Sequence, residues 1–211
     1  MRFFGSLEIK GLHNLDEVKT NVIFACNHSN EFDPFMVPGP LPFMSRFSPI
    51  FYASREKGFY SKCGWRQVFY GGFLFRMWGA FPVFIGLNDY EKSLVQHIRI
   101  LNDGGNDVVY PEGGTTRDGR LQPAKGGVAY LAERTGKPIV PVAIIGTFQL
   151  SPGVFISRRR KLKVIFGKPI YADEMKSHAQ TLEKKESFAH YKEMSEYVMK
   201  RIGEMLDVET K

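Results

Sequence analysis

The chain carries seven short apolar runs of the composition expected for β-strands, separated by turn residues or by stretches with helical periodicity. Several of these runs are apolar at consecutive rather than alternate positions, which is typical of strands covered by helices on both faces. The seven predicted strands are Leu7–Ile9, Val22–Cys26, Ile50–Ala53, Phe81–Ile85, Val108–Tyr110, Ile139–Ile145 and Leu162–Phe166.

Three segments show the apolar spacing of helices: one from about Asp89 to Asp103, one from Gly126 to Arg134, and one from Asp173 toward Asp207. An apolar stripe along the third segment predicts a helix packed on the sheet. Its members are Phe188, Tyr191, Met194, Val198, Ile202 and Met205. Strands that alternate with helices predict a layered α/β fold, in which polar chemistry gathers in loops just past the carboxyl ends of strands.

Composition narrows the class of protein. The 211 residues are 43% hydrophobic and 24% charged, and they contain no repeat or linker, so we expect a single folded domain over residues 1–211. The net charge of +7 indicates an anionic partner: nucleic acid, a membrane surface or an acidic carrier. Two cysteines, Cys26 and Cys63, do not make a disulfide framework, and we expect reduced thiols in a cytoplasmic protein.

The longest apolar stretch, Gly71 to Leu87, is interrupted by Arg76 and Pro82, and we therefore expect no membrane-spanning segment. The N-terminal stretch Met1 to Gly5 is too short for a signal peptide, so we expect none. The segment from Arg46 to Trp78 mixes aromatic and basic residues, as does a membrane-surface segment. The same mixture suits single-stranded nucleic acid, although no nucleic-acid motif accompanies it, and many of these aromatics are expected in the core. A second basic run, residues 158–161, is a further candidate for lipid head groups or an acidic carrier.

The first polar loop follows the second strand, where His28 precedes Asp33 by five positions and Pro34 comes next. A histidine can take a proton from a hydroxyl group, and a carboxylate on its other ring nitrogen orients it and stabilises the imidazolium. Asp33 can do this if the loop curls back. Alternatively, Asp33 and Pro34 cap and begin a helix, which is the commoner meaning of such a loop taken alone. No third side chain has the spacing of a metal ligand, so a metal site is disfavoured.

The second polar loop follows the Val108–Tyr110 strand. Two glycines in it allow close approach of the backbone to an anion, and an arginine offers a charged fork for phosphate. A simple turn is the alternative, since Asp118-Gly119 forms one alone. The candidate residues are Glu112, Gly113, Gly114, Thr115, Thr116 and Arg117.

In order, separation and flanks, the two loops together resemble the lysophosphatidic acid acyltransferase family of glycerolipid acyltransferases. Asn27 to Pro34 matches its block of a histidine and an aspartate separated by four residues, and Tyr110 to Gly113 matches its Phe-Pro-Glu-Gly block. The resemblance extends from about Leu7 to Ile170. Other similar segments are Gly79–Val83, Arg117–Leu121, Lys125–Ala132, Val140–Val142 and Gly167–Ile170.

Two positions depart from the family pattern, which places phosphate-holding arginines after the Glu-Gly pair and after the Pro-Val of the intervening block. Here Thr115 stands at the first position and residues 84–86, including Ile85, stand at the second. Either Arg117 and Lys125 hold the phosphate together with the glycine backbone, or the acceptor carries a different head group. The departures therefore concern the acceptor more than the reaction.

The resemblance implies a mixed, largely parallel sheet flanked by helices, of the glycerol-3-phosphate acyltransferase type. It implies an O-acyltransferase that uses an acyl thioester of coenzyme A or acyl carrier protein to acylate a lysophospholipid. The first candidate for this acceptor is 1-acylglycerol-3-phosphate. His28 is then the base and Asp33 orients it, without a metal or cofactor. The implied location is cytoplasmic, peripheral on the inner face of an anionic membrane, with no nucleic-acid partner. The implied substrate-binding residues are Glu112, Gly113, Gly114, Thr115, Thr116, Arg117 and Lys125.

Two alternatives remain at this point. A transacylase or lipid hydrolase with a phospholipid as acyl donor needs the same base, and a non-catalytic lipid-binding relative fits the missing arginines.

Overall fold

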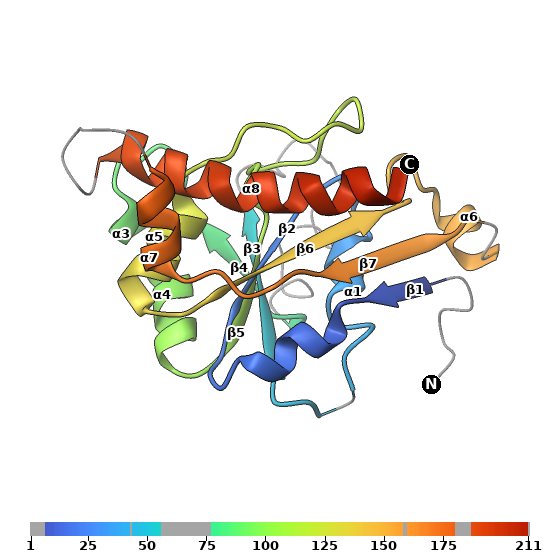
Figure 1. Ribbon diagram of the computed structural model, residues 1–211, viewed down its shortest axis with the longest axis horizontal. Helices are drawn as coiled ribbons and strands as arrows, with labels where there is room; N and C mark the ends of the chain where they lie inside the picture. Colours follow the sequence, from blue (N-terminus) through green and yellow to red (C-terminus); the bar gives the residue numbers. More distant parts are fainter. Residues whose placement is uncertain (1–6, 43, 56–76, 158–159, 180–186, 211) are drawn as a thin grey trace.

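The computed structural model describes residues 7–42, 44–55, 77–157, 160–179 and 187–210. A seven-stranded sheet lies at its centre, in the order β1-β7-β6-β2-β5-β3-β4 (Figure 1). Neighbouring strands are parallel except for β6 and β7, which are antiparallel, so the predicted mixed, largely parallel sheet is confirmed. The strands are β1 (Leu7–Lys10), β2 (Ile23–Cys26), β3 (Ile50–Arg55), β4 (Ala80–Val83), β5 (Asn106–Val109), β6 (Ile139–Ile145) and β7 (Leu162–Phe166).

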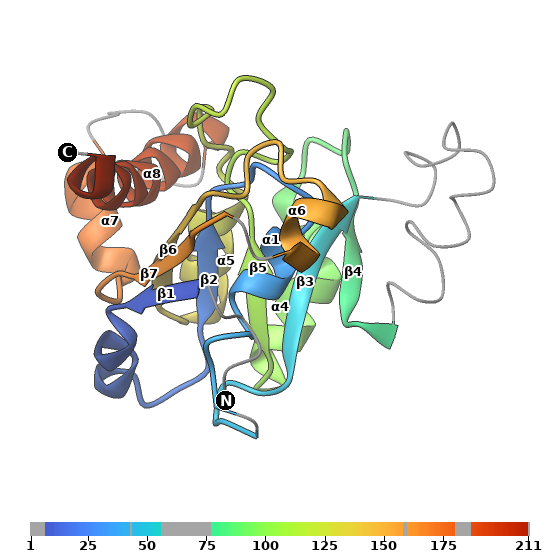
Figure 2. The ribbon, with the colours of Figure 1, turned by 90° about the vertical axis from the view of Figure 1, so that its right-hand side faces the viewer.

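Helices cover both faces of this sheet, and each face has its own apolar core. Figure 1 shows α8 running alongside β6 and β7, and Figure 2 shows α1 and α6 on the other side of the sheet. The first face carries α4 (Val95–Asn102), α5 (Gly127–Thr135), α7 (Ala172–His178) and α8 (Phe188–Thr210), with α3 (Tyr90–Ser93) leading into α4. The second face carries the 3-10 helix η1 (Leu12–Glu17), α1 (Asp33–Met36) and α6 (Pro152–Ser157).

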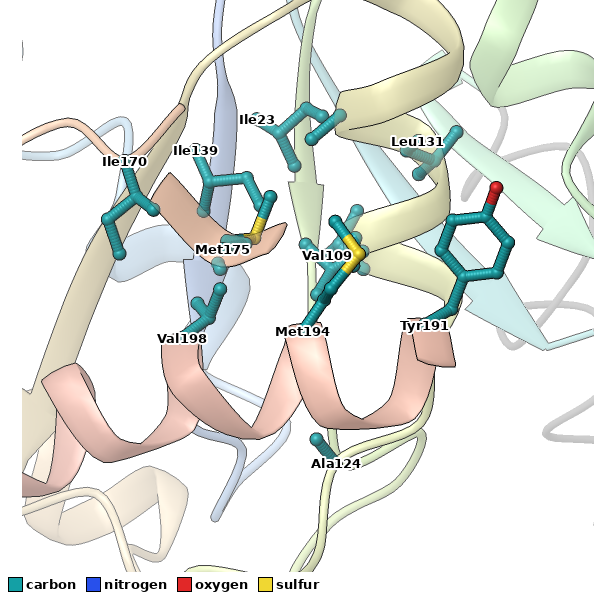
Figure 3. Close-up of a cluster of buried hydrophobic side chains, with 14 of the residues drawn as sticks. Ile23, Val109, Ala124, Leu131, Ile139, Ile170, Met175, Tyr191, Met194 and Val198 are labelled. Atoms are coloured by element: carbon teal, nitrogen blue, oxygen red, sulfur yellow. The ribbon is translucent and has the colours of Figure 1, made fainter. Parts of the chain in front are cut away.

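The long helix α8 packs on the sheet through the apolar stripe predicted for it. Met194 and Val198 point from α8 toward Val109 and Ile139 of the strands, and Tyr191 lies beside α5, near Leu131 (Figure 3). Burial of such side chains is worth roughly 1.5–3 kcal/mol each, and it orders the helix. Ile202 is also buried and Met205 is half-buried, whereas Phe188, the first residue of α8, is 48% exposed.

Two predicted helices are each divided in the structure. The segment from Asp89 to Asp103 forms α3 and α4, because Leu94 leaves helical geometry at φ −113° and ψ 13°. The region beyond Asp173 is not one helix: α7 ends at His178, Ala179 is extended, and α8 begins at Phe188. An apolar stripe persists across such breaks, so periodicity alone does not reveal them.

The strand order places the two predicted loops at one edge of the sheet. Strand β2 pairs in parallel with β5, and Ala25 lies opposite Val109, so the segments that follow both strands leave the sheet side by side. Most of the aromatic and basic segment, residues 56–76 with Cys63, lies outside the described residues, as do Arg158 and Arg159. Within the described ranges, no helix is both long enough and apolar enough to cross a membrane.

Candidate active site

The loop after β2 closes on itself and brings His28 against Asp33. The ring Nδ1 of His28 lies 2.9 Å from Oδ2 of Asp33, and the same oxygen accepts the backbone N–H groups of Ser29 at 2.6 Å and Asn30 at 2.8 Å. These donors compensate one oxygen of a carboxylate that is completely buried. The His28 side chain is 18% exposed, so the imidazole reaches the surface while its partner does not.

The structure separates the two interpretations of Asp33. Phe32 is the N-cap of α1 without a side-chain bond, and Asp33 and Pro34 are the first helical residues. The carboxylate of Asp33 bonds to groups that precede it in the chain instead of capping the helix that follows. The helix-cap interpretation is therefore wrong, and the predicted contact of Asp33 with His28 is present.

Glu112 joins the second loop to the first. Its Oε1 accepts the backbone N–H of His28 at 2.8 Å, and its Oε2 accepts that of Gln122 at 2.8 Å. A further bond runs from the N–H of Thr116 to the carbonyl of His28, also at 2.8 Å. Burial raises the pKa of Glu112, and the two backbone donors oppose that shift. The backbone of His28 is thus held on both sides by residues of the second loop.

Two further side chains tie the first loop to β6. Asn27 exchanges two hydrogen bonds with the backbone of Ile144, at 2.9 and 2.7 Å. The hydroxyl groups of Ser29 and Thr147 are 2.7 Å apart, and Thr147 is buried. The loop is consequently anchored to strands on both sides of β2, which gives His28 a rigid support.

The ring of Tyr110 lies flat against His28, with ring centroids 4.0 Å apart and planes inclined by 21°. Tyr110 directly follows β5, and Cys26 ends the adjacent β2. Burial raises the pKa of the Cys26 thiol well above its usual range, so Cys26 is a neutral core residue. The stacked tyrosine was not among the residues predicted from sequence, because only the strand pairing places it beside His28.

Positive side chains flank the Gly113-Gly114 turn. Gly113 has a left-handed φ of 72°, and a Cβ there would lie 2.8–3.0 Å from the end of the Lys125 side chain. A Cβ on Gly114 would lie 2.9 Å from Nη2 of Arg55, and that nitrogen donates to the Gly113 carbonyl at 2.8 Å. The positive φ favours glycine at residue 113, and at both positions the absence of a Cβ lets the ends of these two cationic side chains approach the backbone closely. Lys125 was predicted here, whereas Arg55, the last residue of β3, was known only as part of the basic segment.

The remaining predicted residues lie farther along the same loop. Thr115, Arg117 and Lys125 are exposed, and Thr116 is half-buried with its hydroxyl donating to Asp118 at 2.9 Å. Of the second basic run, Arg160 donates to the carbonyl of Phe148 at 2.6 Å and so supports the loop after β6. Among the described residues, no three His, Cys, Asp or Glu side chains cluster as metal ligands do.

Comparison with known proteins gives the family of this chain. Residues 6–145 match the protein-family model described as Acyltransferase. The chain is 26% identical over 174 residues to a chloroplastic 1-acyl-sn-glycerol-3-phosphate acyltransferase of Brassica napus, covering 81% of this chain and 47% of that protein. It is 25% identical over 174 residues to a protein of the same description from Arabidopsis thaliana, covering 81% and 45%. The chain thus spans about half the length of these curated relatives.

The fold has a counterpart among solved structures. The crystal structure of the 1-acyl-sn-glycerophosphate acyltransferase PlsC from Thermotoga maritima superposes with a TM-score of 0.57, covering 94% of this chain and 72% of that one. The sequences are 17% identical, so this likeness concerns the fold.

Proposed function

Because the chain belongs to the acyltransferase family, we propose that it transfers a fatty acyl group from an acyl thioester to the free hydroxyl of a lysophospholipid, with 1-acylglycerol-3-phosphate as the first candidate. The observation that carries the proposal is the contact between His28 and Asp33, held in place by Glu112 and Thr116 of the second loop. A base, its orienting carboxylate and a glycine turn with cations then share one edge of the sheet.

In the proposed reaction, Asp33 occupies Nδ1 of His28, which leaves Nε2 to take the proton of the acceptor hydroxyl. The acceptor oxygen attacks the thioester carbonyl and a tetrahedral oxyanion forms. As this intermediate collapses, the C–S bond breaks and the imidazolium returns its proton to the leaving thiolate. General acid–base help of this kind is worth on the order of 10²–10⁴-fold in rate.

The oxyanion or the acceptor phosphate requires N–H donors. The N–H groups of His28, Ser29 and Gly113 already bond to Glu112, Asp33 and the Tyr110 carbonyl. In the part of the chain that the structure describes, those of Gly114 and Thr115 make no hydrogen bond. We assign these two as donors to a bound anion.

For the acceptor phosphate, we propose Arg55 and Lys125 as the principal cations. Both approach the Gly113-Gly114 turn, from β3 and from the segment before α5. An arginine fork and a lysine together match a phosphomonoester. Arg117 is exposed on the same loop and is a secondary candidate. This arrangement offers a replacement for the two arginines that the family pattern places at Thr115 and Ile85.

We further propose that the protein works at the inner face of an anionic membrane, with acyl-CoA or acyl carrier protein as donor. The apolar side chains of Met77 and Trp78 are 64% and 62% exposed, and Trp78 lies edge-on to Phe35 on α1 at 5.7 Å. Exposed tryptophan and methionine together with a net charge of +7 suit a membrane interface.

A panel of acceptors tests the proposal. Purified protein is mixed with palmitoyl thioester and with lysophosphatidate, lysophosphatidylcholine, lysophosphatidylglycerol or glycerol 3-phosphate, and free thiol is followed. We expect the release of free thiol to depend on lysophosphatidate and to be abolished in His28→Ala. Arg55→Ala should raise the KM for lysophosphatidate by about 10-fold or more, whereas Arg99→Ala, an exposed arginine on α4, should leave it unchanged.

Three results contradict the proposal. If His28→Ala turns over as fast as the wild type, His28 is not the base. Fatty acid released from phospholipid without added thioester indicates a transacylase or hydrolase instead. Liposome binding without any turnover in the wild type indicates a lipid-binding protein.

A further inference from the structure

The imidazole of His28 is held from two directions. Asp33 holds it at one edge through Nδ1, at 2.9 Å. Tyr110 covers one face at a centroid distance of 4.0 Å. An edge contact alone leaves the ring free to tilt about the hydrogen bond, and a flat aromatic neighbour restricts that motion.

The backbone of Tyr110 is itself well fixed. It leaves β5 beside the end of β2, its carbonyl accepts the N–H of Gly113 at 2.9 Å, and the next carbonyl, that of Pro111, accepts the N–H of Lys125 at 2.8 Å. The backbone that carries the ring is therefore held in place independently of the His28 side chain.

The aromatic ring is the part of the Tyr110 side chain that contacts His28. Its hydroxyl is buried, and among the described residues it has no hydrogen-bond partner. Burial raises the pKa of this phenol well above its usual range, and the nearby Cys26, Asp33 and Tyr52 act in the same direction. A neutral phenol without a partner neither accepts nor delivers a proton here, so any contribution comes from the aromatic face.

We propose that Tyr110 is a positioning residue for His28. Its face keeps the imidazole in the plane in which Asp33 reaches Nδ1 and Nε2 meets the acceptor hydroxyl. The electron-rich face also favours the imidazolium that forms when the hydroxyl loses its proton. This role rests on the proposed acyl transfer, and it requires an aromatic ring at residue 110 but no hydroxyl.

Substitutions separate the ring from the hydroxyl. Tyr110→Phe keeps the ring and should retain kcat within about twofold. Tyr110→Leu removes it and should lower kcat by about 10- to 100-fold while KM changes little. If the leucine variant does not fold, Tyr110→Met fills the space without an aromatic face and carries the same expectation. Tyr52→Leu, which removes a neighbouring core phenol that is not stacked on His28, should keep kcat.

A spectroscopic reading does not depend on turnover. Proton NMR of histidine-labelled protein, with His28→Gln to assign the signals, should show the His28 ring protons shifted upfield by the stacked ring. The shift should persist in Tyr110→Phe and Tyr52→Leu and disappear in Tyr110→Leu. Unchanged His28 signals in an active Tyr110→Leu, or equal losses of kcat in the phenylalanine and leucine variants, overturn the inference. A wild type that shows the shift but transfers no acyl group refutes the proposed function, and the catalytic role of Tyr110 with it.

Discussion

At the scale of single residues, Asp33 shows how one side chain shapes a loop and serves the site within it. Its Oδ2 accepts from two backbone N–H groups and faces the imidazole, and its own N–H donates to the Asn30 carbonyl at 3.1 Å. These bonds bring Asp33 into contact with His28, five positions earlier in the sequence, a contact that the sequence alone did not establish. The donors replace water at Oδ2, whereas Oδ1 is also buried and has no hydrogen-bond partner among the described residues.

Asp33→Asn tests the charge separately from the shape. The amide oxygen can still accept from Ser29 and Asn30, so the fold should persist, but the imidazolium loses its anionic partner. We expect kcat to fall by about 10²–10⁴-fold, measured together with circular dichroism and thermal melting. Asp16→Asn, an exposed carboxylate on η1, is the matched control. A kcat within twofold of the wild type would show that Asp33 only shapes the turn.

At the scale of elements, a second histidine–aspartate pair joins α4 to β5. Nδ1 of His97 lies 2.7 Å from Oδ2 of Asp107, and both side chains are fully buried. The sequence places His97 on a helix but gives no sign of its partner, because the pair depends on how α4 docks on the strand. The break at Leu94 was equally hidden: Leu94 and Ile98 still make the helical bonds to Tyr90 and Leu94, so only the dihedral angles change.

This pair predicts a stability that depends on pH. Burial lowers the pKa of His97, but the charge and hydrogen bond of Asp107 outweigh burial and raise it, while burial raises the pKa of Asp107. A histidine whose pKa is raised by folding stabilises the folded state. This contribution is complete below the pKa of the unfolded state, about 6.5, and is lost as the pH rises through the pKa of the folded state. The raised pKa of Asp107 acts in the same direction, since ionisation then opposes folding.

Urea unfolding from pH 6 to 9 measures this effect. We expect the wild-type free energy of unfolding to fall with rising pH above about 6.5, and the slope to disappear in His97→Gln/Asp107→Asn. His97→Gln alone leaves a buried carboxylate unpaired and should cost about 3–5 kcal/mol near neutral pH. His13→Gln, at an exposed position, should keep the wild-type slope. If the double variant keeps that slope as well, the pair is not its source.

At the scale of the whole molecule, local pattern predicted the seven strands, and the signal is clearest in β2 and β6, which are buried almost throughout and consist of apolar residues. It also predicted the edge with the two loops, since polar residues such as His28 and Glu112 immediately follow two of those runs. The strand order and the reversal at β7 depend on long-range pairing that no local pattern records. For the same reason Arg55 and Tyr110, which reach the site from β3 and β5, became apparent only in three dimensions. The single domain predicted over residues 1–211 stays a prediction.

The proposed reaction, in which His28 and Asp33 move an acyl group from a thioester to a lysophospholipid hydroxyl, yields a product that can be weighed. The most direct measurement is mass spectrometry of the lipids after incubation of the protein with palmitoyl thioester and lysophosphatidate. We expect a lipid product heavier by one palmitoyl group, formed together with free thiol, and its rate of formation to fall by at least about 100-fold in His28→Gln. Equal product from His28→Gln, or palmitate release without acylation of the acceptor, would contradict it.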